Sequence, residues 1–81
     1  MNRYKTDMSV QCAVCYDEKQ YSLWGNKHGC FMFLREEHGK VVYEDFFFNL
    51  EDVLEECKYN NPLRRLVEVL LGGEHKPVVW Q

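Results

Sequence analysis

The chain has 81 residues, a mass of 9.8 kDa and a formal net charge of −3 with neutral histidines. This length predicts a single domain over residues 1–81. Apolar residues make up 46% and aromatic residues 15%, which excludes the composition of a disordered tail. The acidic balance argues against direct nucleic-acid binding, which relies on cationic contacts to phosphates. No apolar run approaches the roughly 20 residues of a membrane span, and the first residues contain no apolar signal core, so we expect a cytoplasmic protein without a membrane partner.

Four segments are rich in β-prone residues, and the first two also show the apolar alternation of half-buried strands. They are residues 9–16, 20–24, 30–35 and 40–47. Short polar or glycine-containing turns separate them, so we expect consecutive strands to pair in antiparallel fashion as a β-meander. The third and fourth segments have apolar residues on both faces, which predicts that they form the central pair of the sheet. Residues 1–8 and 74–81 are expected to be loose tails.

The apolar spacing changes from a period of two to about 3.6 after residue 48. Asn49 is suited to cap a first helix, with Asp52 at its third position. Leu50, Val53, Leu54 and Cys57 would form one apolar stripe on that helix.

Asn61 and Pro62 suit the cap and first position of a second helix, which Gly72 and Gly73 would end. Its apolar residues again follow a helical period. The predicted fold is therefore α+β: a four-stranded antiparallel β-meander followed by two C-terminal helices packed on one face.

Four cysteines raise the alternative of a zinc-stapled domain. The candidate ligands are Cys12, Cys15 and either His28 with Cys30 or Cys30 with Cys57. In a strand, residues three apart point to opposite faces, and the intervening Ala13-Val14 is poor turn chemistry. We therefore favour four reduced cysteines that serve as small core residues, with no cofactor.

Catalysis by these cysteines has little support in the sequence. A redox C-x-x-C motif needs a helix N-terminus to lower the pKa of a thiol, whereas this motif falls in a predicted strand. No motif that would orient a Cys–His nucleophile surrounds any cysteine. We therefore expect no enzymatic activity.

Negative charge is concentrated in one segment. Residues 36–56 contain eight acidic side chains and one lysine, a net charge of −7. Helical spacing places like charges four residues apart on the first helix, an arrangement that stability alone does not favour. One interpretation is a docking surface that imitates nucleic-acid phosphates and binds a basic protein surface; the alternative is an ordinary solvated helix face. The candidate partner-binding residues are Glu44, Asp45, Glu51, Asp52, Glu55 and Glu56.

Residues 17–24, Asp-Glu-Lys-Gln-Tyr-Ser-Leu-Trp, resemble the N-E-E-x-Y-S-L-W-P signature of MbtH-like proteins. These are small partners of nonribosomal peptide synthetase adenylation domains. The resemblance implies a three-stranded sheet with a helix, and partner-binding roles for Ser22 and Trp24. Gly25 replaces the final proline of the signature, and the later P-x-G-W and W-T-D-x-R-P-x-S elements of the family are absent.

In its size, acidity and order of elements, the chain also resembles small accessory proteins of phages and prophages. Some of these are anti-CRISPR or anti-restriction inhibitors that bind a host nuclease complex stoichiometrically. This resemblance implies a non-enzymatic inhibitor that docks on a basic surface of a host nucleic-acid-handling complex in the host cytoplasm. A further alternative is a homodimer joined along an exposed strand edge or through Trp80.

Overall fold

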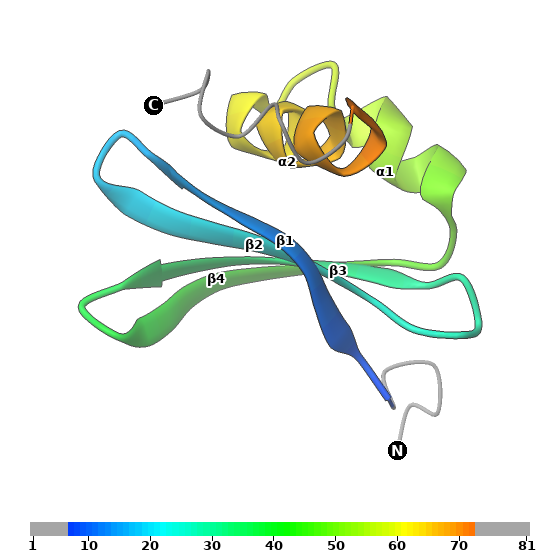
Figure 1. Ribbon diagram of the computed structural model, residues 1–81, viewed down its shortest axis with the longest axis horizontal. Coiled ribbons are helices and arrows are strands. Elements are labelled where there is room, and N and C mark those ends of the chain that lie inside the picture. Colours follow the sequence, from blue (N-terminus) through cyan, green and yellow to red (C-terminus); the bar gives the residue numbers. More distant parts are fainter. Residues whose placement is uncertain (1–6, 73–81) are drawn as a thin grey trace.

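The computed structural model describes residues 7–72. Its elements are β1 (Ser9–Tyr16), β2 (Lys19–Gly25), β3 (Phe31–Glu37), β4 (Lys40–Phe47), α1 (Leu50–Glu56) and α2 (Asn61–Gly72). The prediction of an antiparallel four-stranded sheet followed by two helices is confirmed (Figure 1). Within residues 7–72 neither helix has the length and apolarity to cross a membrane. Of the expected tails, residues 1–6 and 74–81 fall outside the described part of the chain.

The strand order is β1-β2-β3-β4, so β2 and β3 form the centre of the sheet and β4 lies at an edge. The prediction that the third and fourth strands are the central pair is therefore wrong. The register shifts between Arg35 and Glu36, so that Val42 lies in a bulge. Val41 and Val42 are about half exposed. The apolar signal of Val41 and Val42 thus reflects a bulged edge and not burial on two sides.

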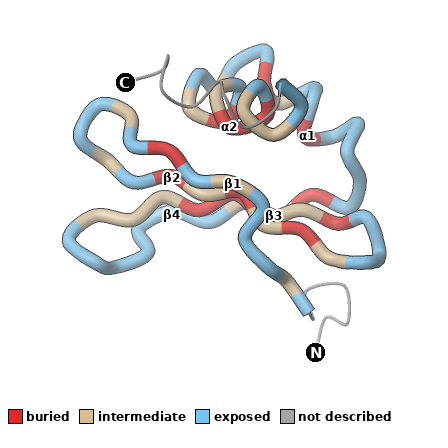
Figure 2. The backbone as a smooth tube through the Cα atoms, viewed as in Figure 1, coloured by how far each residue is buried: buried red, intermediate tan, exposed pale blue. Residues whose placement is uncertain are grey.

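Both helices lie on one side of the sheet (Figure 1). The longer helix α2 packs on β1 and β2, and α1 packs on β4. The fully buried side chains are Leu23, Val53, Leu63 and Leu66, and the buried positions of α2 lie on its sheet-facing side (Figure 2). Each such side chain contributes roughly 1.5–3 kcal/mol through removal from water. This core fixes both helices over one face, and no helix within residues 7–72 covers the other face, which we call the open face.

Asparagine side chains cap both helices. Asn49 Oδ1 accepts a hydrogen bond of 2.8 Å from the Asp52 amide, as expected. The second cap is Asn60, whose Oδ1 accepts from the Leu63 amide at 3.1 Å. The predicted cap, Asn61, is instead the first residue of α2. Two adjacent asparagines have the same capping chemistry, and burial of Leu63 selects the register.

Only half of the predicted apolar stripe on α1 is buried. Val53 and Cys57 lie in the core, whereas Leu50 and Leu54 are 37% and 42% exposed. A seven-residue helix that packs against neighbours on one flank can bury only the side chains directed to that flank. The exposed leucines therefore remain on the outer surface of α1.

Candidate functional site

The six candidate acidic residues do not form one surface. Glu44 is exposed on the open face of the sheet, because it pairs with Leu34. Asp45 is half-buried and points to the helix-covered side, where it pairs with Phe33. Neighbouring residues of a strand alternate between faces, so the strand itself separates these two carboxylates.

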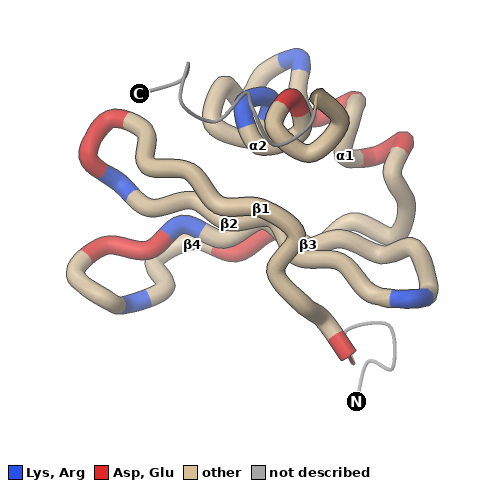
Figure 3. Tube along the Cα trace, in the orientation of Figure 1, with Lys and Arg blue, Asp and Glu red and all other residues tan. Residues whose placement is uncertain are grey.

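The other four acids belong to α1 (Figure 3). Glu51, Asp52 and Glu55 are exposed, and Glu56 is half-buried. Glu55 forms an exposed ion pair of 3.0 Å with Lys58, which contributes little to stability. Glu51 and Asp52 lie in the first helical turn, where the helix dipole favours carboxylates. The helix therefore presents an acidic outer surface.

A row of aromatic rings crosses all four strands on the helix-covered face. Tyr16 of β1 packs edge-to-face on Tyr21 of β2, with ring centroids 6.3 Å apart. Tyr21 stacks on Phe33 of β3 at 5.7 Å. Phe33 packs edge-to-face on Tyr43 of β4 at 6.1 Å. The row exists because the strand register brings one aromatic residue from each strand to the same face.

A groove of about 380 Å³ lies between this aromatic row and the connection from α1 to α2. The sheet contributes the four rings and Arg35, while Glu56, Tyr59 and Pro62 come from the helical side. Tyr59 is 80% exposed. An aromatic side chain with so much apolar area in water is typical of a contact surface.

Tyr43 occupies the electronegative end of the groove. Its hydroxyl donates a hydrogen bond of 3.4 Å to Asp45 Oδ2. Burial and the carboxylates of Asp45 and Glu56 raise the pKa of Tyr43, while Arg35 acts weakly in the opposite direction. Two of the predicted site residues, Asp45 and Glu56, are therefore brought together around one phenol ring.

Two arginines lie along the aromatic row. Arg35 Nε is 3.2 Å from Glu37 Oε2, in an ion pair whose angle does not make a hydrogen bond. Arg65 of α2 places its guanidinium carbon 5.5 Å from the centroid of the Tyr16 ring, a cation–π contact. The β1 end of the row therefore already holds a guanidinium group.

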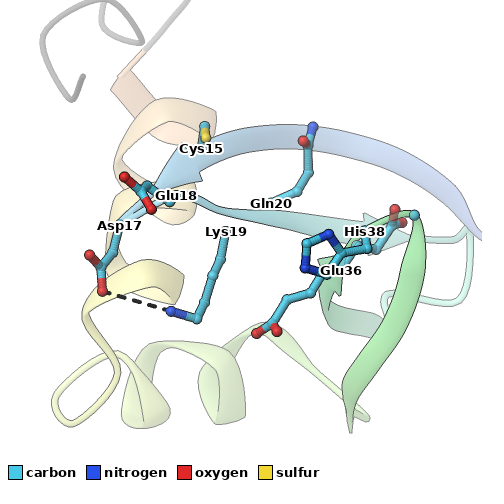
Figure 4. A pocket seen from close by; sticks show the side chains of 9 residues that line it. Cys15, Asp17, Glu18, Lys19, Gln20, Glu36 and His38 are labelled. Carbon is cyan, nitrogen blue, oxygen red and sulfur yellow. Dashed lines mark ion pairs between the residues drawn. The ribbon is translucent and has the colours of Figure 1, made fainter.

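A second hollow, of about 430 Å³, lies at the end of the sheet where the β1–β2 and β3–β4 turns meet. Its walls include Cys15, Lys19, Glu36 and His38, and Lys19 pairs with Asp17 at 3.9 Å (Figure 4). Figure 4 shows the Cys15 thiol and the His38 ring well apart and not directed toward each other. This arrangement offers no Cys–His nucleophile pair.

The four cysteines are distributed over the fold. Cys12 faces the helices and its thiol donates to the Leu66 carbonyl at 3.2 Å, and burial raises the pKa of Cys12 to about 11. Cys15 is exposed on the opposite face, so the predicted separation of the C-x-x-C pair is confirmed. Cys30 and Cys57 are buried. Among residues 7–72, no three of the side chains able to bind a metal are grouped together.

Of residues 17–24, which resemble the MbtH-like signature, Asp17 and Glu18 lie in the β1–β2 turn and the rest lie on β2. The Trp24 indole N–H donates to the Ser22 hydroxyl at 2.9 Å, which holds the ring along the strand. Trp24 pairs with Val10 and Met32, and Met32 pairs with Phe46. These residues form an apolar row across the open face of the sheet.

Sequence reasoning missed the groove. Tyr16, Tyr21, Phe33 and Tyr43 were visible as aromatic residues, but only the register aligns them. One signal could have found them: each of these residues is an even number of positions away from an apolar core residue of its own strand, so the two lie on the same face of the sheet. Comparison with known protein families, curated proteins and solved structures finds no match to this chain.

Proposed function

We propose that this protein is a non-enzymatic binding protein whose acidic surface docks on a basic surface of a protein partner. We define the acidic surface as Asp45, Glu51, Asp52, Glu55 and Glu56. The observation that carries the proposal is the set of four α1 carboxylates, three of them exposed, with no basic residue in the last turn of that helix. Glu44, on the other face of β4, belongs to a different surface.

Electrostatics explains what such a surface achieves. Carboxylates spaced along one helix resemble a row of phosphates in charge, so they attract a lysine- and arginine-lined groove and accelerate encounter. The net charge of −3 adds to this attraction. The concrete form of the proposal is a phage-type inhibitor, of the anti-CRISPR or anti-restriction kind, that occupies the nucleic-acid site of a host complex.

A tagged pull-down from host lysate tests this function. Nuclease is added to remove nucleic-acid bridges, parallel samples are washed at low and high salt, and bound proteins are identified by mass spectrometry. We expect a stoichiometric nucleic-acid-handling complex that is lost at high salt, because exposed charge pairs are screened by salt. Recovery of no salt-sensitive partner would overturn the proposal.

A second candidate function is self-association through the open face of the sheet. The apolar row of Val10, Trp24, Met32 and Phe46 favours this alternative, because aromatic and methionine side chains are enriched at interfaces. Light scattering across a concentration series tests it. A mass that stays at 9.8 kDa would exclude a homodimer.

A further inference from the structure

We propose that the groove between the aromatic row and the α1–α2 connection binds the guanidinium group of an arginine side chain on the partner. This inference rests on the proposed function, because it assigns one specific contact to the basic partner. The groove shares Glu56 and the neighbouring Asp45 with the acidic surface, whereas Glu51, Asp52 and Glu55 do not line it.

The walls of the groove have the chemistry that a guanidinium group requires. Tyr43, which is 43% exposed, supplies the accessible ring of one wall beside the buried Tyr21 and Phe33, and Tyr59 and Pro62 belong to the other wall. A planar guanidinium stacks on aromatic faces, where the ring quadrupole attracts its charge. Tyrosine hydroxyls at the edge of such a site can accept hydrogen bonds from its N–H groups.

The charges around the groove favour a cation at the Tyr43 end. Glu56 lines the groove, and Asp45 accepts the hydrogen bond from Tyr43. Both carboxylates act on Tyr43 more strongly than Arg35 does. Arg35 is the one cationic side chain among the described residues that line the groove, and its charge is offset by Glu37 at 3.2 Å.

The protein already uses the other end of the same aromatic row in this way. Arg65 lies over the Tyr16 ring at 5.5 Å. Tyr43, at the opposite end of the row, combines a similar ring with two nearby carboxylates. An arginine from the partner would therefore repeat at β4 the contact that α2 makes at β1.

The exposure of Tyr59 gives the site an accessible wall. This ring is 80% exposed although it lines the groove. Burial of a tyrosine against an arginine is a frequent source of binding energy at protein interfaces. The structure thus pairs an electronegative aromatic groove with an exposed ring at its opening.

The test uses small probes that do not depend on the identity of the partner. N-acetyl-arginine amide is titrated into the labelled protein, and the neutral isostere N-acetyl-citrulline amide serves as the matched probe. NMR shifts of the aromatic rings report the site. We expect a dissociation constant on the order of 1–10 mM for the arginine probe, since exposed cation–π contacts are weak, and at least about fivefold weaker binding of the citrulline probe.

Two variants and one matched control locate the binding. Glu56→Gln and Tyr59→Ala should each raise the dissociation constant of the arginine probe roughly fivefold. The first variant removes a charge of the groove and the second removes an aromatic wall. Glu68→Gln, at an exposed position of α2 that does not line the groove, should leave binding unchanged. Tyr59 is exposed, so its replacement does not disturb the core.

Equal binding of the two probes, shifts confined to the outer acids of α1, or no saturable shift up to about 50 mM would overturn the inference. Failure of the inference about the groove is distinguishable from failure of the proposed function. A chain that binds the arginine probe but captures no salt-sensitive partner contradicts the function and supports the groove. A chain that captures such a partner but does not bind the probe contradicts only the inference that the groove binds a guanidinium group.

Discussion

Tyr43 and Asp45 are two positions apart in the edge strand β4, and the Tyr43 hydroxyl lies 3.4 Å from Asp45 Oδ2. Both side chains face the helix-covered side of the sheet, where Glu56 of α1 also acts on the phenol. This pair links the acidic segment to the aromatic groove. It also makes Tyr43 a reporter of the charge in that region.

We predict that Tyr43 titrates at a higher pH than an ordinary tyrosine. Burial is the largest cause of the raised pKa, followed by the Asp45 carboxylate, because both disfavour the phenolate. Asp45→Asn should lower the pKa of Tyr43. The stabilisation linked to this group is present below the pKa of unfolded tyrosine and is lost as the pH rises through the raised folded pKa.

Tyrosine-labelled NMR across the alkaline range measures this titration. Glu51→Gln is the matched control, because Glu51 is not among the charges that act on Tyr43. An Asp45→Asn chain whose Tyr43 pKa stays unchanged would show that the carboxylate does not contribute.

We predict that Cys12 reacts far more slowly with thiol reagents than Cys15. Burial raises the pKa of Cys12 from 9.0 to about 11, which lowers the fraction of reactive thiolate roughly a hundredfold. Cys15 is exposed. Reaction kinetics of Cys15→Ser and Cys12→Ser chains separate the two thiols, and comparable rates at both positions would contradict the packing of Cys12 against α2.

We predict that Glu18→Gly stabilises the protein. Glu18 has φ of 65° in the β1–β2 turn, a conformation that costs a non-glycine residue roughly 1 kcal/mol. Gly39→Ala is the converse change, because Gly39 has φ of 79°, which alanine disfavours. A Cβ there would meet no atom within 4 Å, so the cost would come from the backbone conformation and not from a steric clash. Chemical denaturation should show a gain for the first variant and a loss of about 1 kcal/mol for the second. A destabilised Glu18→Gly chain would contradict the described turn.

We predict that Leu66→Ala costs about 2–5 kcal/mol of unfolding free energy, since this side chain is fully buried. Leu71→Ala, at a position that is 66% exposed on the same helix, should change it by less than about 0.5 kcal/mol. Denaturant unfolding of both chains measures the difference. Similar losses would contradict the docking of α2 on β1 and β2.

Local sequence signals predicted most of the fold. Runs of β-prone residues between short turns located the four strands, and the capping chemistry of Asn49 located α1, because these signals act over a few residues. The meander predicted the strand order, but the choice of the third and fourth strands as the central pair was wrong, since Val41 and Val42 carry the same apolar signal in a bulged edge strand as in a central one. The choice between Asn60 and Asn61 as the second cap depended on which register buries Leu63.

The candidate site was predictable only in part. Composition identified the acidic segment, but it placed Glu44 and Asp45 together although the strand directs them to opposite faces. The aromatic groove depends on cross-strand register and on the path of the α1–α2 connection. Neither is a property of any one segment, so the alignment of Tyr21, Phe33 and Tyr43 was not visible along the sequence.

Charge reversal on α1 shows whether this helix is the acidic docking surface. Glu51, Asp52, Glu55 and Glu56 are changed together to Lys, and a matched chain carries Lys at four other exposed acids, Asp7, Asp17, Glu18 and Glu68. Circular dichroism verifies both folds, because lysines in the first turn of α1 oppose the helix dipole by roughly 0.3–1 kcal/mol each. We expect only the α1 reversal to release the salt-sensitive partner. Retention of the partner by a folded α1-reversed chain, or equal loss in both chains, would contradict this expectation.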